Sequence, residues 1–280
     1  MNSAVPETPA LSQRAATGKP GAPAVVGVGI CLLLAVAQIA VAGYQIGVGN
    51  QAIQIAFVKA WASPGLFAND EMVRQTMPLY PSFFFRMIAP LVRAFGLAPV
   101  YLVLQILTSF ATLAAVYALG RAIFRSHTAA LAGVVLLVAG HHQALAGDGL
   151  YSTGFTHTYI ALPIAVAALA LGYRRRLVAG FLLAGILFNI HALTAAYVML
   201  MLGAALLADL GRERPAIWFR RVALCGGAAI VPALPTLVQM VTQHQVFDAG
   251  WVNLMRVRSA DHSFPSSWWV AGDPDVPRFV

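Results

Sequence analysis

The chain has 280 residues, of which 59% are hydrophobic and only 10% are charged. An ordinary soluble domain carries about a quarter charged residues, so this composition excludes that class and indicates a membrane protein. The formal net charge of +8 does not indicate nucleic-acid binding, because the basic residues stand in separate clusters between apolar runs rather than in one basic domain.

The N-terminal segment, residues 1–23, is rich in Ala, Pro, Ser and Thr and has no apolar periodicity. It is predicted to be a disordered cytoplasmic tail. The first apolar run follows at 24–44, and its Ala40-Val41-Ala42 resembles a signal-peptide cleavage site. The run is longer than the usual signal core of about 7–15 residues, so we expect an uncleaved membrane span.

A long outer loop is predicted for residues 45–97. Two segments in it, 50–62 and 81–95, combine apolar residues at helical spacing with basic residues. Helices of this kind lie in the plane of the lipid headgroups. In the first of them, Ile53, Phe57 and Trp61 form the apolar face, with Gln51, Gln54 and Lys59 away from it. The basic residues, for which we expect a lipid phosphate as ligand, are Lys59, Arg86 and Arg93.

Between the two interfacial segments stand Asp70 and Glu71, the only adjacent acidic pair in the chain. They follow the turn-like Ser63-Pro64-Gly65 and are expected in a loop. A solvated pair of loop acids is the simplest interpretation. The alternative is a general base and metal ligand at the membrane surface, which the neighbouring basic residues favour.

Six further apolar runs complete a membrane domain over residues 24–243. With the first run they predict an all-α, polytopic fold of about seven transmembrane helices. Several runs are shorter than the roughly 20 residues that cross a hydrocarbon core, which is tolerated where spans line a protein-walled cavity. For 177–210 the alternative is a single re-entrant hairpin. The six runs are 98–120, 129–140, 157–172, 177–190, 192–210 and 222–241.

The basic clusters stand at alternate junctions between these runs. Lys and Arg remain on the side of the membrane from which a chain is inserted, so the junctions with arginine are expected in the cytoplasm. This predicts a multi-pass protein of the inner (plasma) membrane with a cytoplasmic N-terminus and anionic lipid as a partner. The clusters comprise Arg14 and Lys19, Arg121 and Arg125, Arg174 to Arg176, and Arg212, Arg214, Arg220 and Arg221.

The opposite face carries most of the histidines. His141, His142, Asp148 and His157 share one outer loop, and His191 stands at the next outer turn. These residues either meet water and backbone at the membrane boundary or form a substrate or metal pocket. His191 follows a continuous apolar helix, where an ionisable group is a functional candidate by default. A haem would need two histidines facing each other, and only His157 and His191 suit that arrangement.

The last segment, residues 244–280, is predicted to be an outer aromatic and polar tail. Trp268 in this tail is expected to anchor the membrane boundary, or alternatively to stack on a sugar ring. The sequence ends abruptly at Val280, which indicates a truncated product or the first part of a longer protein. The two cysteines, Cys31 and Cys225, fall inside apolar runs and are interpreted as packing residues.

The order of these elements resembles the GT-C class of polyprenyl-phosphate-sugar-dependent membrane glycosyltransferases. That class has a first span, a large outer loop with an acidic motif and interfacial helices, and then many short spans. The segments His157-Thr158-Tyr159 and Phe188-Asn189-Ile190-His191-Ala192-Leu193 also resemble bacterial multi-span proteins of this type. The chain departs from the class in having fewer spans and no sizeable soluble domain after them.

The resemblance implies sugar transfer from a lipid-phosphate donor on the extracytoplasmic face. Asp70, with Glu71 beside it, would be the catalytic base that takes the proton of an acceptor hydroxyl. Arg86, Arg93 or a divalent ion such as Mg²⁺ or Mn²⁺ would stabilise the departing phosphate. The residues expected to contact substrate are Lys59, Arg86, Arg93, His141, His142, Asp148, His157, His191 and Trp268.

Two other functions remain open from sequence. A transporter would need polar groups at mid-depth and usually an inverted repeat, and no convincing repeat is found. A non-catalytic multi-span scaffold needs neither. Polar residues in the middle of a span more often join helices to one another than line a transport pathway. In this chain they are Gln38, Gln105, Thr108, Ser109 and Asn189.

Overall fold

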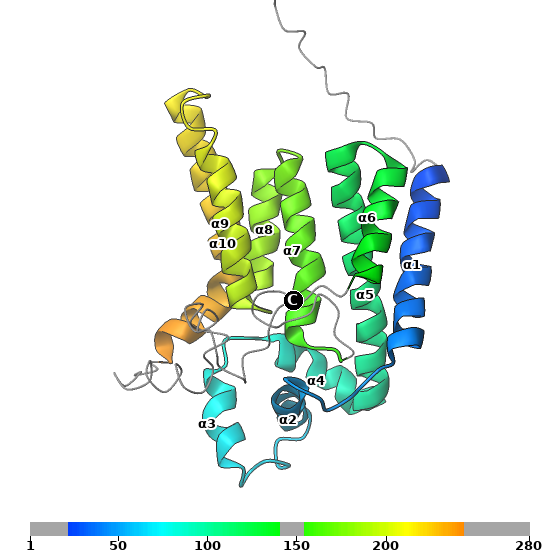
Figure 1. Ribbon diagram of the computed structural model, residues 1–280. Coiled ribbons are helices and arrows are strands. Elements are labelled where there is room, and N and C mark those ends of the chain that lie inside the picture. Colours follow the sequence, from blue (N-terminus) through cyan, green and yellow to red (C-terminus); the bar gives the residue numbers. More distant parts are fainter. Residues whose placement is uncertain (1–21, 141–153, 244–280) are drawn as a thin grey trace, which may run out of the picture.

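The computed structural model describes residues 22–140 and 154–243, and every regular element in these ranges is a helix. The all-helical prediction is thus confirmed for this part of the chain. Seven helices run side by side as a bundle, one from each predicted apolar run (Figure 1). They are α1 (Ala22–Ala42), α5 (Leu97–Phe124), α6 (His127–Ala139), α7 (His157–Tyr173), α8 (Leu177–Phe188), α9 (Ala192–Leu207) and α10 (Pro215–Thr242).

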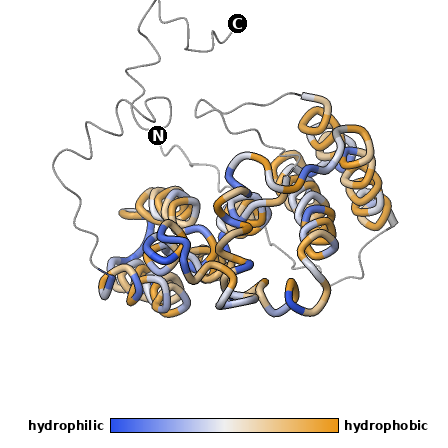
Figure 2. The backbone as a smooth tube through the Cα atoms, turned by 90° about the horizontal axis from the view of Figure 1, so that it is seen from below, coloured by the Kyte–Doolittle hydropathy of each residue, from blue (hydrophilic) through white to orange (hydrophobic). Residues whose placement is uncertain are grey.

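Three of these helices are long and apolar enough to cross a membrane: α5, α10 and the Pro23–Val41 part of α1. The other four, α6 to α9, are apolar but have 17 residues or fewer. Large apolar side chains such as Leu33, Leu136 and Leu200 are exposed on the outside of the bundle, and hydrophobic residues dominate its helices in Figure 2. A surface of this kind belongs in lipid, so the chain is a helical membrane protein.

The bundle consists of two groups of helices. One group, α1, α5 and α6, shares a core around Cys31, Leu113 and Tyr117. The other group, α7 to α10, shares the larger core, and α5 joins the two groups by packing on α7. Small residues allow close contact, since a Cβ atom on Gly185 of α8 would collide with the backbone oxygen of Ala229 in α10.

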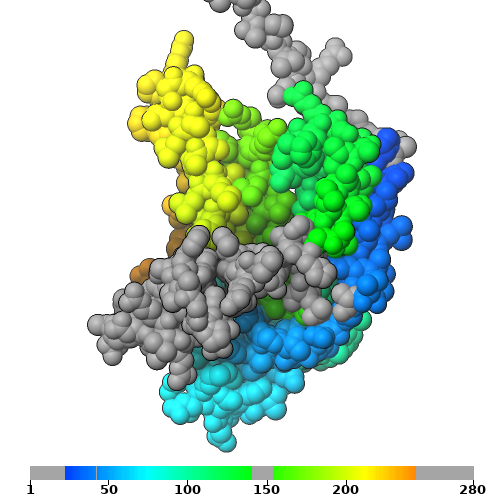
Figure 3. Space-filling model, in the orientation of Figure 1, coloured from blue at the N-terminus to red at the C-terminus, as the bar shows by residue number. Residues whose placement is uncertain are grey.

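The three remaining helices form a layer across one end of the bundle. They are α2 (Gln51–Ala62), α3 (Glu71–Leu79) and α4 (Phe84–Phe95), and they close the lower end of the molecule in Figure 3. The turns that carry the arginine clusters, between α5 and α6, α7 and α8, and α9 and α10, lie together at the opposite end. This is the separation that the alternating basic clusters predict.

The layer differs from the sequence prediction in two ways. Helix α3 was not predicted, because its nine residues mix polar and apolar side chains without a continuous apolar run and include Pro78. Asp70 starts it as the N-cap instead of lying in a loop. In α2, Gln51 and Gln54 are buried against the bundle while Ile53 points outward, so the face assigned from the apolar spacing was wrong at Ile53. The buried glutamines bond to the bundle, which periodicity alone does not reveal.

Candidate functional site

Two of the predicted site residues meet at the seam between the outer layer and the bundle. His157 is the first residue of α7, and His191 stands in the turn between α8 and α9. Their ring centroids lie 4.9 Å apart, with the ring planes inclined by 43°. The structure thus brings the two histidines into direct contact, although they are 34 positions apart in the sequence.

His157 is enclosed by aromatic side chains and only 4% exposed. The rings of Tyr80 and Phe85 both lie 5.5 Å from its own ring, measured between centroids. The Tyr80 hydroxyl is 3.1 Å from Nε2 of His157. Atom Nδ1 is buried and has no hydrogen-bond partner among the described residues. Burial in such surroundings favours the neutral ring and leaves one nitrogen available to a ligand or a water molecule.

His191 is half-buried and has a structural task as the N-cap of α9. Its Nδ1 accepts a hydrogen bond from the backbone N–H of Thr194 at 3.2 Å and lies 2.8 Å from the Thr194 hydroxyl. Because Nδ1 acts as an acceptor, the proton of the neutral ring is on Nε2. The cap accounts for an ionisable residue directly after an apolar helix without a catalytic role.

The layer is attached to the bundle by hydrogen bonds that flank the histidine pair. On one side, Gln51 Nε2 donates to the carbonyl of Phe155 at 2.7 Å. Beside it, Gln54 Oε1 accepts from the backbone N–H of His157 at 3.2 Å. On the other side, Ser82 Oγ donates to the carbonyl of Ile190 at 2.7 Å. These bonds hold the aromatic enclosure closed over His157.

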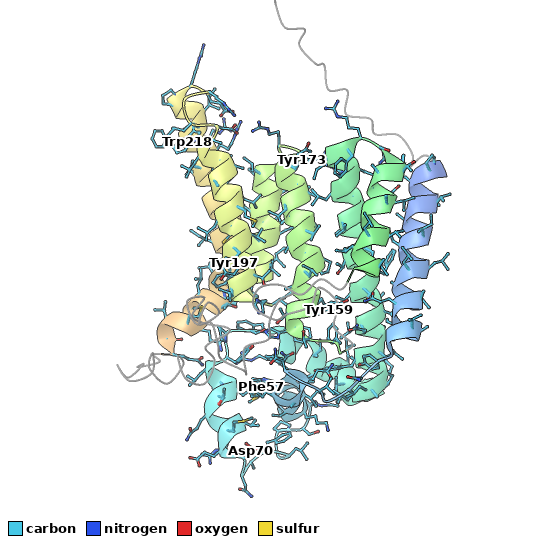
Figure 4. The ribbon with its side chains drawn as sticks, viewed as in Figure 1. Phe57, Asp70, Tyr159, Tyr173, Tyr197 and Trp218 are labelled. Atoms are coloured by element: carbon cyan, nitrogen blue, oxygen red, sulfur yellow. The ribbon has the colours of Figure 1, made fainter. Side chains whose placement is uncertain are left out.

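The acidic pair does not join the histidines. Asp70 lies toward the lower tip of the layer in Figure 4, below Phe57 and well away from Tyr159 in the bundle. It is exposed, and its Oδ1 accepts from the backbone N–H of Val73 at 2.9 Å. Glu71 is also exposed and accepts from Gln75 Nε2 at 2.8 Å. The structure therefore gives both acids a role at the start of α3.

The three predicted basic residues have different surroundings. Arg93 Nε donates to the carbonyl of Ala62 at 2.8 Å and so caps the C-terminus of α2. Lys59 is exposed in the last turn of the same helix. The guanidinium carbon of Arg86 lies 4.4 Å from the centroid of the Trp61 ring and 5.1 Å from that of Phe83. Arg86 is exposed, and no described residue accepts a hydrogen bond from it.

The described residues were expected to include a metal or haem site around the two histidines. Among the residues that the structure describes, no group of three or more His, Cys, Asp or Glu side chains is placed to hold a metal ion. Haem does not fit between His157 and His191 either, because the two rings are in contact and leave no room for a porphyrin. His141, His142, Asp148 and Trp268 lie outside the residues that the structure describes.

Sequence reasoning missed Asp209, a buried acid at the arginine-bearing end. Its carboxylate lies 2.8 Å from Arg175, 3.3 Å from Arg221 and 3.8 Å from Arg212. Arg221 also pairs with Glu213 at 2.7 Å. The sequence pattern that could have revealed this cluster is an acid followed closely by several arginines. The cluster joins the α7–α8 turn to the α9–α10 turn, which is a structural role.

No family model, curated protein or solved structure matches this chain. The function is therefore argued from the outer layer and the seam. Two features could contact a ligand: the exposed guanidinium of Arg86, which is stacked on Trp61, and the buried ring of His157, whose Nδ1 has no partner among the described residues.

Proposed function

We propose that the chain is a GT-C-like membrane glycosyltransferase that binds a lipid-phosphate-linked sugar on the face carrying α2 to α4. In this proposal all seven bundle helices cross the inner membrane. The N-terminus and the arginine-bearing turns lie in the cytoplasm, and the outer layer lies on the extracytoplasmic side. The proposal draws on the arrangement of the helices and on the sequence resemblance.

The outward face of α4 is the observation that carries the proposal. Met87, Leu91 and Phe95 follow one another at four-residue spacing and are 62%, 45% and 69% exposed. The other face of α4 is also apolar and packs on the protein, with Phe85 and Ile88 buried. A helix that is apolar on both faces suits a site where one face meets protein and the other meets lipid.

Arg86 adds phosphate recognition to this apolar face. Stacking on Trp61 and Phe83 holds its guanidinium in place without using the N–H groups at its edge. Those groups match the oxygens of a phosphate in a bidentate manner. Among the basic residues of the layer, Arg86 is therefore the best candidate for the donor phosphate, because Arg93 is committed to α2.

The proposed reaction is a displacement at the anomeric carbon of the sugar. The acceptor hydroxyl forms the new C–O bond, the bond to the lipid phosphate breaks, and the hydroxyl proton passes to a base. Asp70 is the base by resemblance to the GT-C class, and its position as an exposed cap adds no support to that role. Phosphate is a good leaving group, so stabilising its charge by Arg86 is the main contribution expected of the protein.

Binding is tested with the purified full chain in nanodiscs and a photoreactive polyprenyl-phosphate sugar. We expect labelling to fall about tenfold in Arg86→Gln, as for the loss of one charge-assisted contact to phosphate. Arg74→Gln is the matched control, because Arg74 is an exposed cation of the same layer. Equal loss in both variants, or no labelling of the wild type, would contradict the proposal and favour the transporter or scaffold function.

The role of Asp70 is tested separately by two substitutions. Asn is as good an N-cap as Asp, so Asp70→Asn removes the base but retains the start of α3. Asp70→Ala removes both, at a cost of about 1 kcal/mol in helix stability. If Asp70 is the base, both variants lose transfer of radiolabelled sugar. Transfer by Asp70→Asn at the wild-type rate would leave Asp70 as a helix cap only.

A further inference from the structure

Helix α10 bends near its C-terminal end, where it carries Pro232 and Pro235 (Figure 1). Pro235 has no N–H, and its ring pushes away the preceding turn of the helix. Such a bend weakens the next bond along the helix, from the N–H of Thr236 to the carbonyl of Pro232, which are i+4 and i partners in a regular helix. Both groups face the bundle and need other partners, since Thr236 is fully buried.

Asn189, from the turn between α8 and α9, supplies partners for both groups. Its Nδ2 donates to the carbonyl of Pro232 at 2.7 Å. Its Oδ1 accepts from the backbone N–H of Thr236 at 3.3 Å and from the Thr236 hydroxyl at 2.9 Å. One side-chain amide thus bonds to both of the backbone groups whose mutual pairing the bend weakens.

The same turn and the same helix also hold the connection between α3 and α4. The Asn189 carbonyl accepts from the backbone N–H of Phe83 at 2.8 Å. Beyond the bend, Gln239 Nε2 donates to the carbonyls of Pro78 and Tyr80, at 2.9 and 3.2 Å. The hydrogen bonds therefore form a closed ring through the α3–α4 connection, the α8–α9 turn and the bent part of α10.

We propose that this ring is a latch that couples the bend of α10 to the closure of the outer layer over His157. When α10 straightens, the Pro232 carbonyl again accepts from the backbone N–H of Thr236. The Asn189 amide then loses its partners, and Gln239 moves away from residues 78–80. Tyr80 belongs to the released connection and is bonded to His157, so release uncovers that histidine. The inference does not depend on sugar transfer, because it describes how the buried seam becomes accessible to any ligand.

The latch is tested by the rate at which a cysteine in the seam reacts with a water-soluble maleimide. The reporter is Ile190→Cys in the full chain in nanodiscs, with the buried Cys31 and Cys225 replaced by Ala. Ile190 is buried beside the histidine pair in the closed structure. We expect Asn189→Ala to raise the labelling rate about tenfold, because the latched state loses the hydrogen bonds of one buried amide.

A second variant separates the latch from general loosening. Pro235 is exposed, so Pro235→Ala removes no packing and improves the helix, yet it should raise labelling of Ile190→Cys by allowing α10 to straighten. Thr112→Val is the matched control, because Thr112 is buried in α5 and bonds only within that helix. Unchanged labelling in Asn189→Ala and Pro235→Ala, or an equal rise in Thr112→Val, would overturn the proposal.

Discussion

Replacing Asp209 with Asn tests the packing at the arginine-bearing end. The carboxylate is buried and is surrounded by Arg175, Arg212 and Arg221. Asn has nearly the same volume as Asp but no charge, so the substitution removes the electrostatic attraction while leaving the packing in place. We expect this end of the bundle to lose stability, because the three guanidinium groups then keep only Glu213, which is paired with Arg221, as a counter-charge among the described residues.

The size of the effect follows from the exposure of the partners. The side chains of Arg175 and Arg212 are 67% and 69% exposed, so water screens their pairs and each contributes only a few tenths of a kcal/mol. Arg221 is 33% exposed and contributes more, about 1 kcal/mol. The sum is about 2 kcal/mol, equivalent to a fall of roughly 4–8 °C in Tm for a domain of this size.

Thermal unfolding in detergent, followed by circular dichroism, measures this change. The matched control is Glu213→Gln, because Glu213 is paired only with Arg221 among the described residues. It should lower the Tm less, and high salt should narrow the gap between the two variants. A Tm for Asp209→Asn equal to or above that of the wild type would refute the reasoning, since desolvation of the carboxylate would then outweigh its attraction to the arginines.

Two further substitutions test the helix packing and the seam. Gly185→Ala should cost about 2 kcal/mol in unfolding free energy, because its methyl group collides with α10. Gly133→Ala is the control and should be neutral or stabilising, because Gly133 faces open space. Equal Tm values for the two variants would show that α8 and α10 are not this close. Tyr80→Phe should cost about 1 kcal/mol by leaving His157 without its hydroxyl partner, and Tyr197→Phe, on an exposed side chain, should not. A wild-type Tm for Tyr80→Phe would show that this bond does not stabilise the seam.

The helices of the bundle were predictable because long apolar runs leave few alternatives. The runs and the arginines between them determine both the helices and the end at which each turn lies. Helix α3 was missed because it is short, lacks a continuous apolar run and depends on the cap provided by Asp70. Residue spacing alone favoured a loop there, and the contact with the backbone N–H of Val73 decided otherwise.

From the sequence, only the end of the bundle at which the site lies could be predicted. His157 and His191 were both expected at the outer end, but their contact depends on how closely α7 packs against α8 and α9. The role of Asn189 was foreseen in part, as an amide that joins helices. That it replaces a pairing inside α10 depends on the bend at Pro235, which places its partners opposite the α8–α9 turn.

The central claim is that the outer layer and the arginine-bearing turns lie on opposite sides of the membrane. Single cysteines at Ala68, beside Asp70, and at Arg176, in the α7–α8 turn, test it in intact cells, with Cys31 and Cys225 replaced by Ala; both positions are exposed. An impermeant maleimide should label Ala68→Cys directly and Arg176→Cys only after the membrane is permeabilised. Labelling of both positions from the same compartment would contradict the account.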